Sequence, residues 1–360
     1  MFNLAKGEQF PAKIRVIGVG GCGGNVVNYM IEKGINGVEF WAMNTDAQDL
    51  KKSLAREKVQ LGGKITGGNG AGGDPKIGRE AAEESREDIK AAIGDANMVF
   101  IVAGMGGGTG TGASPVVASL AREMGVLTVA VVTKPATFEG RNRMRIAEEG
   151  IAELSRVADT IVIIPNDKIM AVKNIPLAKA LGGITAEIPA KAVQGMAEML
   201  IKEGLINLDF EDLKKIMSNS GRALLGVGIG EGENKAVDAI QEALNCPFLE
   251  DFEFGQAKKV LLNLTIDGET FTNEELNEIM EYVHTALGDN IELVFGVVVD
   301  NNIKDSAKVT LIATGIENRE VKMDTLYISQ GFRHFPQVEN KEIIKRDDLE
   351  IPTFLRRQSD

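Results

Sequence analysis

The chain is poor in the residues that build disulfide frameworks and metal sites. Its 360 residues include two cysteines and two histidines, which is too few for a disulfide framework or a Cys/His zinc site. No stretch approaches the roughly 18 apolar residues of a membrane span, and Met1–Gln9 lacks the basic start and apolar run of a secretory signal. We therefore expect a protein of the reducing cytoplasm.

The chain also has no excess of positive charge. It carries 40 Lys and Arg against 52 Asp and Glu, a net charge of -12, which argues against nucleic acid or an anionic membrane surface as a partner. Without an apolar span, direct membrane insertion is not expected either. Its 44% apolar and 26% charged residues are those of a globular protein. At this length two domains are expected.

Two common catalytic signatures are missing. No G-x-x-x-x-G-K-[ST] string occurs, so the P-loop route to ATP or GTP is closed. No Ser-His-Asp or Cys-His arrangement is visible either. Any hydrolysis must use another base.

Short apolar runs alternate with helical patterns in the first half of the chain. Such alternation predicts a Rossmann-like, doubly wound parallel sheet whose loops gather at the carboxyl ends of the strands, where ligands bind. A single amphipathic helix is predicted over Ile77–Ile93, and the glycine-rich Gly62–Gly73 is expected to form a loop. The predicted strands are Lys13–Val19, Val38–Met43, Met98–Ala103, Leu127–Thr133 and Thr160–Ile164.

A second, smaller α/β segment follows a long connecting helix. Apolar residues at helical spacing from Ile188 to Ile201 predict that helix. Beyond it, one helix is expected over Glu274–Leu287, and no comparable glycine turn occurs. The strands expected here are Ala223–Ile229, Lys258–Ile266, Ile291–Val299 and Lys308–Thr314.

Two glycine-rich turns join a predicted strand to a predicted helix. Such a turn presents backbone N–H groups and the positive helix end to a phosphate. Gly18-x-Gly20-x-x-Gly23 alone also fits a dinucleotide-binding oxidoreductase, with Asp46 on the ribose, or a merely tight turn. That reading leaves Gly106–Gly112 unexplained, where five glycines let the backbone wrap a polyphosphate and the threonine hydroxyls add donors.

These residues carry a resemblance to a known family. Gly106–Gly112 reads GGGTGTG, and the chain resembles the tubulin and FtsZ superfamily of GTPases from about Ile14 to Thr314. The other matching strings are GVGGCGGN (Gly18–Asn25), NTDAQ (Asn44–Gln48), GAGGDP (Gly70–Pro75), TFEGRNR (Thr137–Arg143), IPNDK (Ile164–Lys168) and NLDFEDL (Asn207–Leu213).

The resemblance implies a GTP/GDP site with Mg²⁺ held through phosphates and water, not by direct protein ligands. It implies that Asn44, Asp46 and the loop Gly70–Gly73 close over the γ-phosphate, although Asn and Asp are also ordinary turn residues there. Glu139 and Arg143 would reach the ribose and base. The implied nucleotide-binding residues are Gly20, Gly21, Cys22, Asn25, Asn44, Asp46, Gly70, Ala71, Gly72, Gly73, Gly104, Gly106, Gly107, Gly108, Thr109, Gly110, Thr111, Gly112, Thr133, Pro135, Glu139, Arg143, Asn166 and Glu187.

The chain departs from the family around the base. Glu187 stands where the family usually has aspartate to accept the guanine protons, and Asn166 is expected at the other guanine edge. The stacking aromatic falls at Leu181 or Gly182, and Ala136 replaces a usual phenylalanine. We also expect Gly182, Gly183 and Pro189 to break or delay the first turns of the connecting helix.

Two acids in the second half are the candidate catalytic groups. If a helix begins near Asp209, then Asp209 and Asp212 lie one turn apart and share a face. On pattern alone they also read as an N-cap followed by a first-turn acid. By resemblance this loop, with Asn207, enters the nucleotide pocket of the next copy in a head-to-tail homopolymer, where the acids position or activate the attacking water.

The end of the chain carries a short amphipathic segment. Acidic, apolar and basic residues follow one another at helical spacing in Leu349–Arg357, which suits docking as a short helix, while a frayed terminus is the alternative. By resemblance this peptide binds membrane-tethering and regulatory division proteins at the midcell division site. Its implied contact residues are Leu349, Ile351, Pro352, Phe354, Leu355 and Arg356.

The expected organisation follows from these assignments. It consists of a disordered arm (1–11), a GTP-binding domain (12–178), a central helix (179–203), a smaller α/β domain that activates hydrolysis (204–317), a variable linker (318–348) and the partner-binding peptide (349–360). The changes near the base keep a second function open, that of a filament-forming or regulatory relative that hydrolyses GTP slowly.

Overall fold

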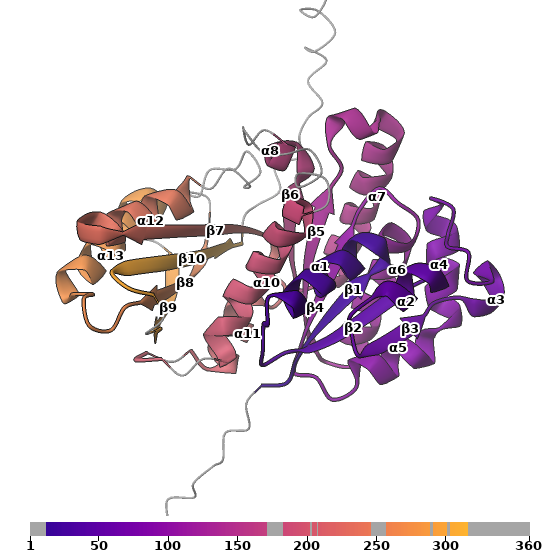
Figure 1. The fold of residues 1–360 in the computed structure, drawn as a ribbon, viewed down its shortest axis with the longest axis horizontal. Helices are drawn as coiled ribbons and strands as arrows, with labels where there is room; N and C mark the ends of the chain where they lie inside the picture. Colours follow the sequence, from indigo (N-terminus) through magenta and orange to yellow (C-terminus); the bar gives the residue numbers. More distant parts are fainter. Residues whose placement is uncertain are drawn as a thin grey trace, which may run out of the picture. The chain divides into compact units, whose positions relative to one another are not determined.

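One sheet runs through the whole described part of the protein (Figure 1). The computed structural model describes residues 12–170, 183–201, 204–206, 208–245, 257–288, 291–300 and 303–315. Ten strands follow the order β3-β2-β1-β4-β5-β6-β7-β10-β8-β9. Their bounds are β1 Ile14–Val19, β2 Glu39–Asn44, β3 Glu57–Gln60, β4 Met98–Gly104, β5 Leu127–Lys134, β6 Thr160–Pro165, β7 Gly221–Glu231, β8 Lys259–Ile266, β9 Glu292–Val299 and β10 Ser306–Thr314.

Helices cover the sheet and connect its strands. The described helices are α1 Gly20–Glu32, α2 Ala47–Lys52, α3 Gly63–Thr66, α4 Pro75–Glu84, α5 Arg86–Ile93, α6 Thr109–Glu123, η1 Thr137–Glu139, α7 Arg141–Val157, α8 Asn166–Met170, α10 Thr185–Ile201, α11 Phe210–Met217, η3 Gly232–Asn234, α12 Lys235–Leu244 and α13 Asn273–Leu287.

The strands from β3 to β7 pair in parallel, and the central strands β1, β4, β5 and β6 are buried on both faces. In β4 the side chains of Met98, Phe100 and Val102 enter one core cluster, while Val99 and Ile101 enter the cluster on the opposite face. A strand covered on both faces needs an unbroken apolar run, which is what the sequence supplies. The predicted doubly wound parallel sheet is therefore confirmed.

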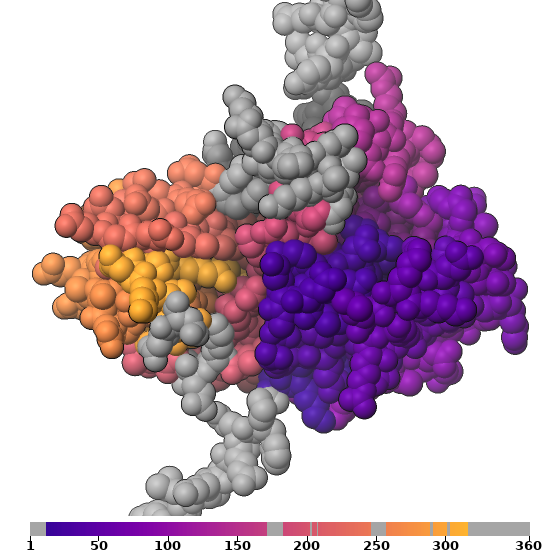
Figure 2. Space-filling model, in the orientation of Figure 1, coloured from indigo at the N-terminus to yellow at the C-terminus, as the bar shows by residue number. Residues whose placement is uncertain are grey.

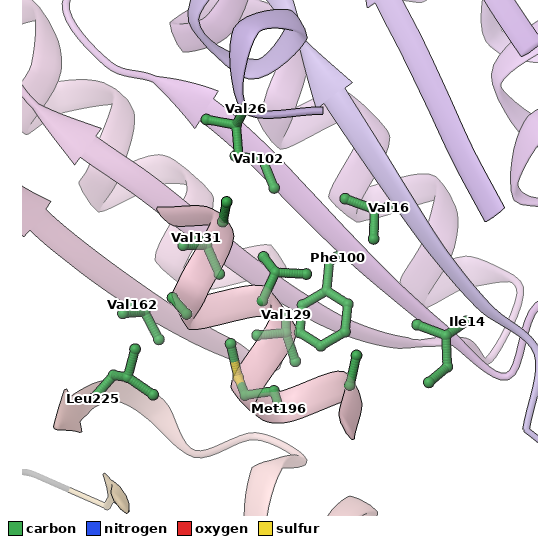
Figure 3. Packing of buried hydrophobic residues seen from close by; sticks show 14 of the residues in the cluster. Ile14, Val16, Val26, Phe100, Val102, Val129, Val131, Val162, Met196 and Leu225 are labelled. Carbon is green, nitrogen blue, oxygen red and sulfur yellow. The ribbon is translucent and has the colours of Figure 1, made fainter. Parts of the chain in front are cut away.

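One core cluster joins the two halves of the molecule. It packs β1, β4 and β5 against α1 and α10, and it continues through Leu225 and Ile312 into β7 and β10 (Figure 3). Phe100 and Met196 lie fully buried in it. The central helix α10 thus packs on both halves, and in the face drawn in Figure 2 the pink segment lies between the indigo-to-magenta half and the orange-to-yellow half.

The second half is a mixed sheet. β10 runs antiparallel to both β7 and β8, while β8 and β9 are parallel. Its outer face packs on α12 and α13 through a third core cluster that includes Ile240, Leu262, Val283 and Leu311. The second α/β domain that the sequence predicts is confirmed.

Three local predictions were wrong. Ile77–Ile93 forms two helices rather than one, because α4 ends at Glu84 and α5 begins at Arg86. The hydroxyl of the intervening Ser85 accepts the Gly62 N–H. Gly182, Gly183 and Pro189 were expected to break or delay the first turns of the connecting helix, but α10 begins at Thr185 and continues through Pro189.

The third concerns Gly20–Gly24, which forms the first turns of α1 instead of a loop before it. The glycines there serve close packing, because a Cβ on Gly23 would lie 2.2 Å from the Val102 carbonyl oxygen.

Several predicted features lie outside the described residues. They are the N-terminal arm, Leu181 and Gly182, Asn207, the linker and the whole C-terminal peptide with Leu349, Ile351, Pro352, Phe354, Leu355 and Arg356.

Candidate nucleotide-binding site

The carboxyl ends of four neighbouring strands meet at one edge of the sheet. β1, β4, β5 and β6 are adjacent and parallel. α1 begins at Gly20 directly after β1, and α6 begins at Thr109 shortly after β4. Because the first N–H groups of a helix have no partner within it, this edge presents donors and the positive ends of two helices. Such an arrangement suits a polyphosphate.

The two glycine turns touch each other through their backbones. Gly20 has a positive φ of 72°, and a Cβ there would lie 3.1 Å from the Gly110 nitrogen. A Cβ on Gly110 would in turn lie 2.4 Å from the Gly104 carbonyl oxygen. A side chain at Gly20 would press on the second turn at Gly110, and one at Gly110 would overlap the Gly104 carbonyl oxygen of its own loop. The two glycine-rich stretches, Gly18–Gly23 and Gly104–Gly112, therefore lie against each other, and we refer to them together as the cradle.

Other glycines of the same loops border open space. A Cβ on Gly107, Gly72 or Gly73 would meet no described atom within 4 Å. The loops that carry them lie side by side, since a Cβ on Gly108 would lie 2.8 Å from Ala71 Cβ. This combination of tight backbone packing and open room is what a bound phosphate chain requires.

The threonine hydroxyls of the cradle have local roles. The Thr109 hydroxyl lies 2.6 Å from that of Thr45. Thr111 is buried, and its hydroxyl oxygen accepts the Gly106 N–H at 2.9 Å. Thr111 thus holds the loop in shape, whereas the half-buried Thr109 lies nearer the solvent.

Asn44 and Asp46 link the strand end to the neighbouring loop. Asn44 Oδ1 accepts the Asp46 N–H at 3.1 Å, and Asp46 Oδ1 caps α2 by accepting from Gln48 and Asp49. The Gly70 N–H donates to the Thr45 carbonyl at 3.3 Å. Asn44 and Asp46 therefore act as turn residues, as the alternative interpretation expects. Their contact with phosphate stays a prediction.

Cys22, Thr133 and Pro135 pack against the glycines of the cradle. The Cys22 Sγ lies 3.6 Å from Thr133 Oγ1. Burial raises the pKa of the Cys22 thiol, so it stays protonated at neutral pH. A Cβ on Gly106 would lie 2.9 Å from Pro135 Cγ. These three residues therefore limit the space behind Gly104 and Gly106.

Glu139, Arg143 and Asn166 come together beside it. Arg143 Nη1 lies 3.0 Å from Glu139 Oε2, and Glu139 Oε1 accepts from the Ala136 N–H at 2.9 Å and from Asn166 Nδ2 at 3.5 Å. Asn166 Oδ1 is buried without a hydrogen-bond partner among the described residues. A buried acceptor without a donor costs about 1–3 kcal/mol, and a donor on a bound base would satisfy it.

Glu187 lies in the first turn of α10, which packs against α1. Its carboxylate pairs with Lys191 at 2.8 Å. Burial, and secondly the Glu187 charge, raise the pKa of Tyr29 on α1. Glu187 is therefore near the helix that begins at the cradle and that also carries the exposed Asn25.

The candidate acids lie apart from all of these residues. Asp209 is the N-cap of α11, and its Oδ1 accepts the Asp212 N–H at 2.7 Å. Both side chains are exposed. α10 separates them from Glu187, and its 17 residues span about 25 Å. Figure 1 shows α10 running from the side of α8 towards α11.

Two supporting residues had not been singled out from the sequence. Asp167 accepts from both the N–H and the hydroxyl of Thr137, at 2.8 and 2.7 Å, and so fixes η1 beside Glu139. Thr45 contacts both the cradle and the Gly70 loop. Thr45 lies in the NTDAQ motif and Asp167 in the IPNDK motif, so the motif matches could have identified both residues.

No helix in the described part of the chain combines the length and apolarity of a membrane span. In the same ranges, no three His, Cys, Asp or Glu side chains are grouped so that they could hold a metal ion.

The family assignment rests on two domain matches. The GTPase domain of the tubulin/FtsZ family matches residues 13–174, and the C-terminal domain of the FtsZ family matches residues 221–317. The chain belongs to the tubulin/FtsZ family of GTPases. This membership removes the oxidoreductase reading of the first glycine turn.

Two curated relatives are similar along their whole length. The cell division protein FtsZ of Wigglesworthia glossinidia brevipalpis is 42% identical over 97% of both chains. The cell division protein FtsZ of Buchnera aphidicola subsp. Acyrthosiphon pisum is 43% identical, again over 97% of both.

Solved structures agree with the fold. An FtsZ dimer from M. jannaschii gives a TM-score of 0.80 at 44% identity, covering 86% of this chain and 90% of that one. CetZ2 of Haloferax volcanii gives 0.72 at 22% identity, covering 86% of this chain and 94% of that one. The second similarity concerns the fold alone.

Proposed function

We propose that the protein is a GTP-dependent, filament-forming cell-division protein that hydrolyses GTP at the junction between successive copies. The observation that carries this is the separation of Asp209 and Asp212 from the cradle by the length of α10. Within one copy the acids are too far away to act on a bound γ-phosphate. A second copy that docks head to tail brings them there.

The phosphates bind in the cradle. Backbone N–H groups at the starts of α1 and α6 donate to the phosphate oxygens, and the open space at Gly107, Gly72 and Gly73 leaves room for them. Asn44 and Asp46 would lie near a Mg²⁺ ion held through the phosphates and water, and the ion would supply positive charge that favours phosphoryl transfer.

Guanine is recognised at both of its edges. Asn166, whose Oδ1 is a buried acceptor without a partner among the described residues, faces one edge. The Glu187 carboxylate accepts N–H groups at the other, and Glu139 and Arg143 hold the ribose. These acceptors suit the N1–H and N2–H₂ donors of guanine, whereas adenine has an acceptor at N1 and no 2-amino group.

Hydrolysis uses the acids of the neighbouring copy. Asp212, with Asp209 and Asn207, orients a water molecule towards the γ-phosphorus and accepts its proton as the bond to the bridging oxygen breaks. The products are GDP and phosphate. Loss of the γ-phosphate removes contacts that hold the junction, so the filament weakens.

The decisive experiment is GTP turnover against protein concentration. We expect activity per molecule to fall towards zero below the concentration at which filaments form, because each nucleotide site then lacks the acids of a neighbouring copy. A self-contained GTPase keeps constant activity per molecule. A flat profile across the assembly threshold, with pelleting as the control for assembly, would sink the proposal.

The remaining segments have separate roles. We infer that 12–178 binds GTP, 179–203 connects, and 204–317 supplies the activating acids, while 318–348 tethers the peptide 349–360. That peptide binds membrane-tethering and regulatory division proteins, which brings the cytoplasmic filament to midcell. Deleting Leu349–Asp360 should spare turnover and pelleting yet abolish recruitment to the membrane, and unchanged recruitment would refute this role.

A further inference from the structure

Three consecutive carbonyl groups end α11, and each accepts a donor from a different strand. Lys259 Nζ on β8 donates to the Lys215 carbonyl at 2.8 Å. Thr314 Oγ1 on β10 donates to the Ile216 carbonyl at 3.3 Å, which also accepts from Ser220. The hydroxyl of Thr160 on β6 donates to the Met217 carbonyl. We refer to Thr160, Lys259 and Thr314 as the α11 socket.

The socket replaces the usual partners of a helix end. The last four carbonyls of a helix have no partner within it and generally turn to water or to a local cap. Here Thr160 and Thr314 are fully buried. The socket therefore fastens α11 to the sheet from both halves of the molecule at once.

The turn after α11 is fastened to the same place. The buried Asp159, next to Thr160, accepts N–H groups from Thr128 at 2.9 Å and from Asn219 at 3.3 Å. Its carbonyl accepts from Ser220 and Gly221 at 2.9 and 3.0 Å. The carboxyl end of α11 thus has little freedom to tilt.

The opposite end of this short helix carries Asp209 and Asp212. α11 has eight residues and is about 12 Å long. A tilt of about 5° at the socket moves its first turn by about 1 Å, and a displacement of that size at a reacting centre can lower turnover by about 10²-fold. The strand β6 that supplies Thr160 ends directly before Asn166 at the nucleotide edge.

We propose that the α11 socket sets the position of the acids for the reaction on the nucleotide of the next copy. Thr160 and Thr314 are then positioning residues for turnover, although they touch neither nucleotide nor water. This rests on the proposed function, in which Asp212 acts across the junction. It adds that the nucleotide half of each copy, through β6, directs the acids that the copy offers to its neighbour.

The test removes the donors without changing side-chain shape. Thr160→Val and Thr314→Val lose only the hydroxyl, and Thr265→Val is the matched control, because Thr265 is a buried strand threonine whose Oγ1 has no partner among the described residues. We expect turnover per polymerised subunit to fall on the order of tenfold in each socket variant. KM for GTP and the pelleted mass should stay within about twofold of the control, and Thr160→Ser should restore turnover.

Two further variants make every outcome decisive. Lys259→Met removes a donor whose side chain is half-exposed, so the buried core keeps its packing. This variant should lower turnover about threefold. If Asp212→Ala is inactive but the three socket variants match Thr265→Val, the socket is overturned and the proposed function stands. If Asp212→Ala keeps normal turnover, both fall. If KM for GTP and the pelleted mass of the socket variants change as much as turnover does, the socket has a structural role only, and the proposal is overturned.

Discussion

The two halves of the sheet differ in the direction of their strands. From β3 to β7 all neighbours are parallel, so their carboxyl ends and the helices that follow gather at one edge. From β7 to β8 the neighbours are antiparallel, and successive strand ends fall on opposite edges. Only the first half can therefore direct several N–H groups at one ligand, whereas the second half shares with β6 the contacts that hold α11. In the proposed function, the parallel half binds the nucleotide, and the mixed half supplies the acids that act on the nucleotide of the next copy.

The largest expected effect tests this division of labour. Asp212→Ala removes a carboxylate but keeps the backbone N–H that Asp209 caps, so folding and GTP binding should be unchanged. Turnover should fall roughly 10²–10⁴-fold, the scale of a positioned acid–base group. Phosphate release by assembled protein is the measurement, with Glu211→Ala on the same turn as control. Near wild-type turnover would assign the chemistry to the first half alone.

A pair of glycine substitutions separates packing from binding within the first half. Gly112→Ala puts a Cβ 2.0 Å from the Pro75 carbonyl oxygen and should reduce the free energy of unfolding by about 1–3 kcal/mol. Gly107→Ala meets open space and should leave stability unchanged while weakening GTP binding. Denaturant unfolding and calorimetry distinguish them. Equal GTP affinity in Gly107→Ala and wild type would mean that the phosphates bind elsewhere.

Shortening the side chain at the base should have a smaller effect. Glu187→Asp removes one methylene and breaks the pairing with Lys191, which frees the carboxylate for the guanine N–H groups. We expect GTP affinity to rise about three- to tenfold, equivalent to about 0.7–1.4 kcal/mol, with inosine triphosphate gaining less because it lacks the 2-amino group. Unchanged or lower affinity by calorimetry would remove Glu187 from base recognition.

The smallest expected effect concerns the stability of the second half in acid. Burial alone would raise the pKa of Glu275, but hydrogen bonds from Lys235 and Thr272 outweigh it and lower the pKa. A lowered folded-state pKa stabilises the protein above the unfolded pKa, near 4.5, and this contribution is lost as pH falls through the folded value. Thermal unfolding should place wild type a few degrees above Glu275→Gln at pH 7. A gap that does not shrink between pH 7 and pH 3 would contradict this.

The sequence predicted the buried strands and the cradle well because both depend on strong local patterns. The apolar runs of β1, β4 and β5 are long enough to identify fully buried strands, and the glycines of 106–112 have few other uses. The short edge strand β3 was missed, because three of its four residues are exposed and show no apolar pattern. The break at Ser85 was missed because its cause is a contact with the distant Gly62.

The site was less predictable than the fold. Motifs identified Asn166 and Glu139, yet only the folded chain brings them within 3.5 Å of each other. The ion pair of Glu187 with Lys191 could be inferred from their spacing of four residues, although its competition with the base could not. The α11 socket has no sequence signature, since its three donors come from strands far apart in the chain.

The solitary buried oxygen of Asn166 has a consequence for nucleotide exchange. If guanine binds here as proposed, its N–H groups give this atom a donor, and departure of the base leaves the atom without one, so the ligand-free form is disfavoured by about 1–3 kcal/mol. Exchange of GDP for GTP must pass through this ligand-free form, or through a form in which a water molecule donates to Asn166 Oδ1. We therefore expect the Asn166 side chain to slow the release of guanine nucleotide and so to lengthen the time for which each subunit keeps GDP.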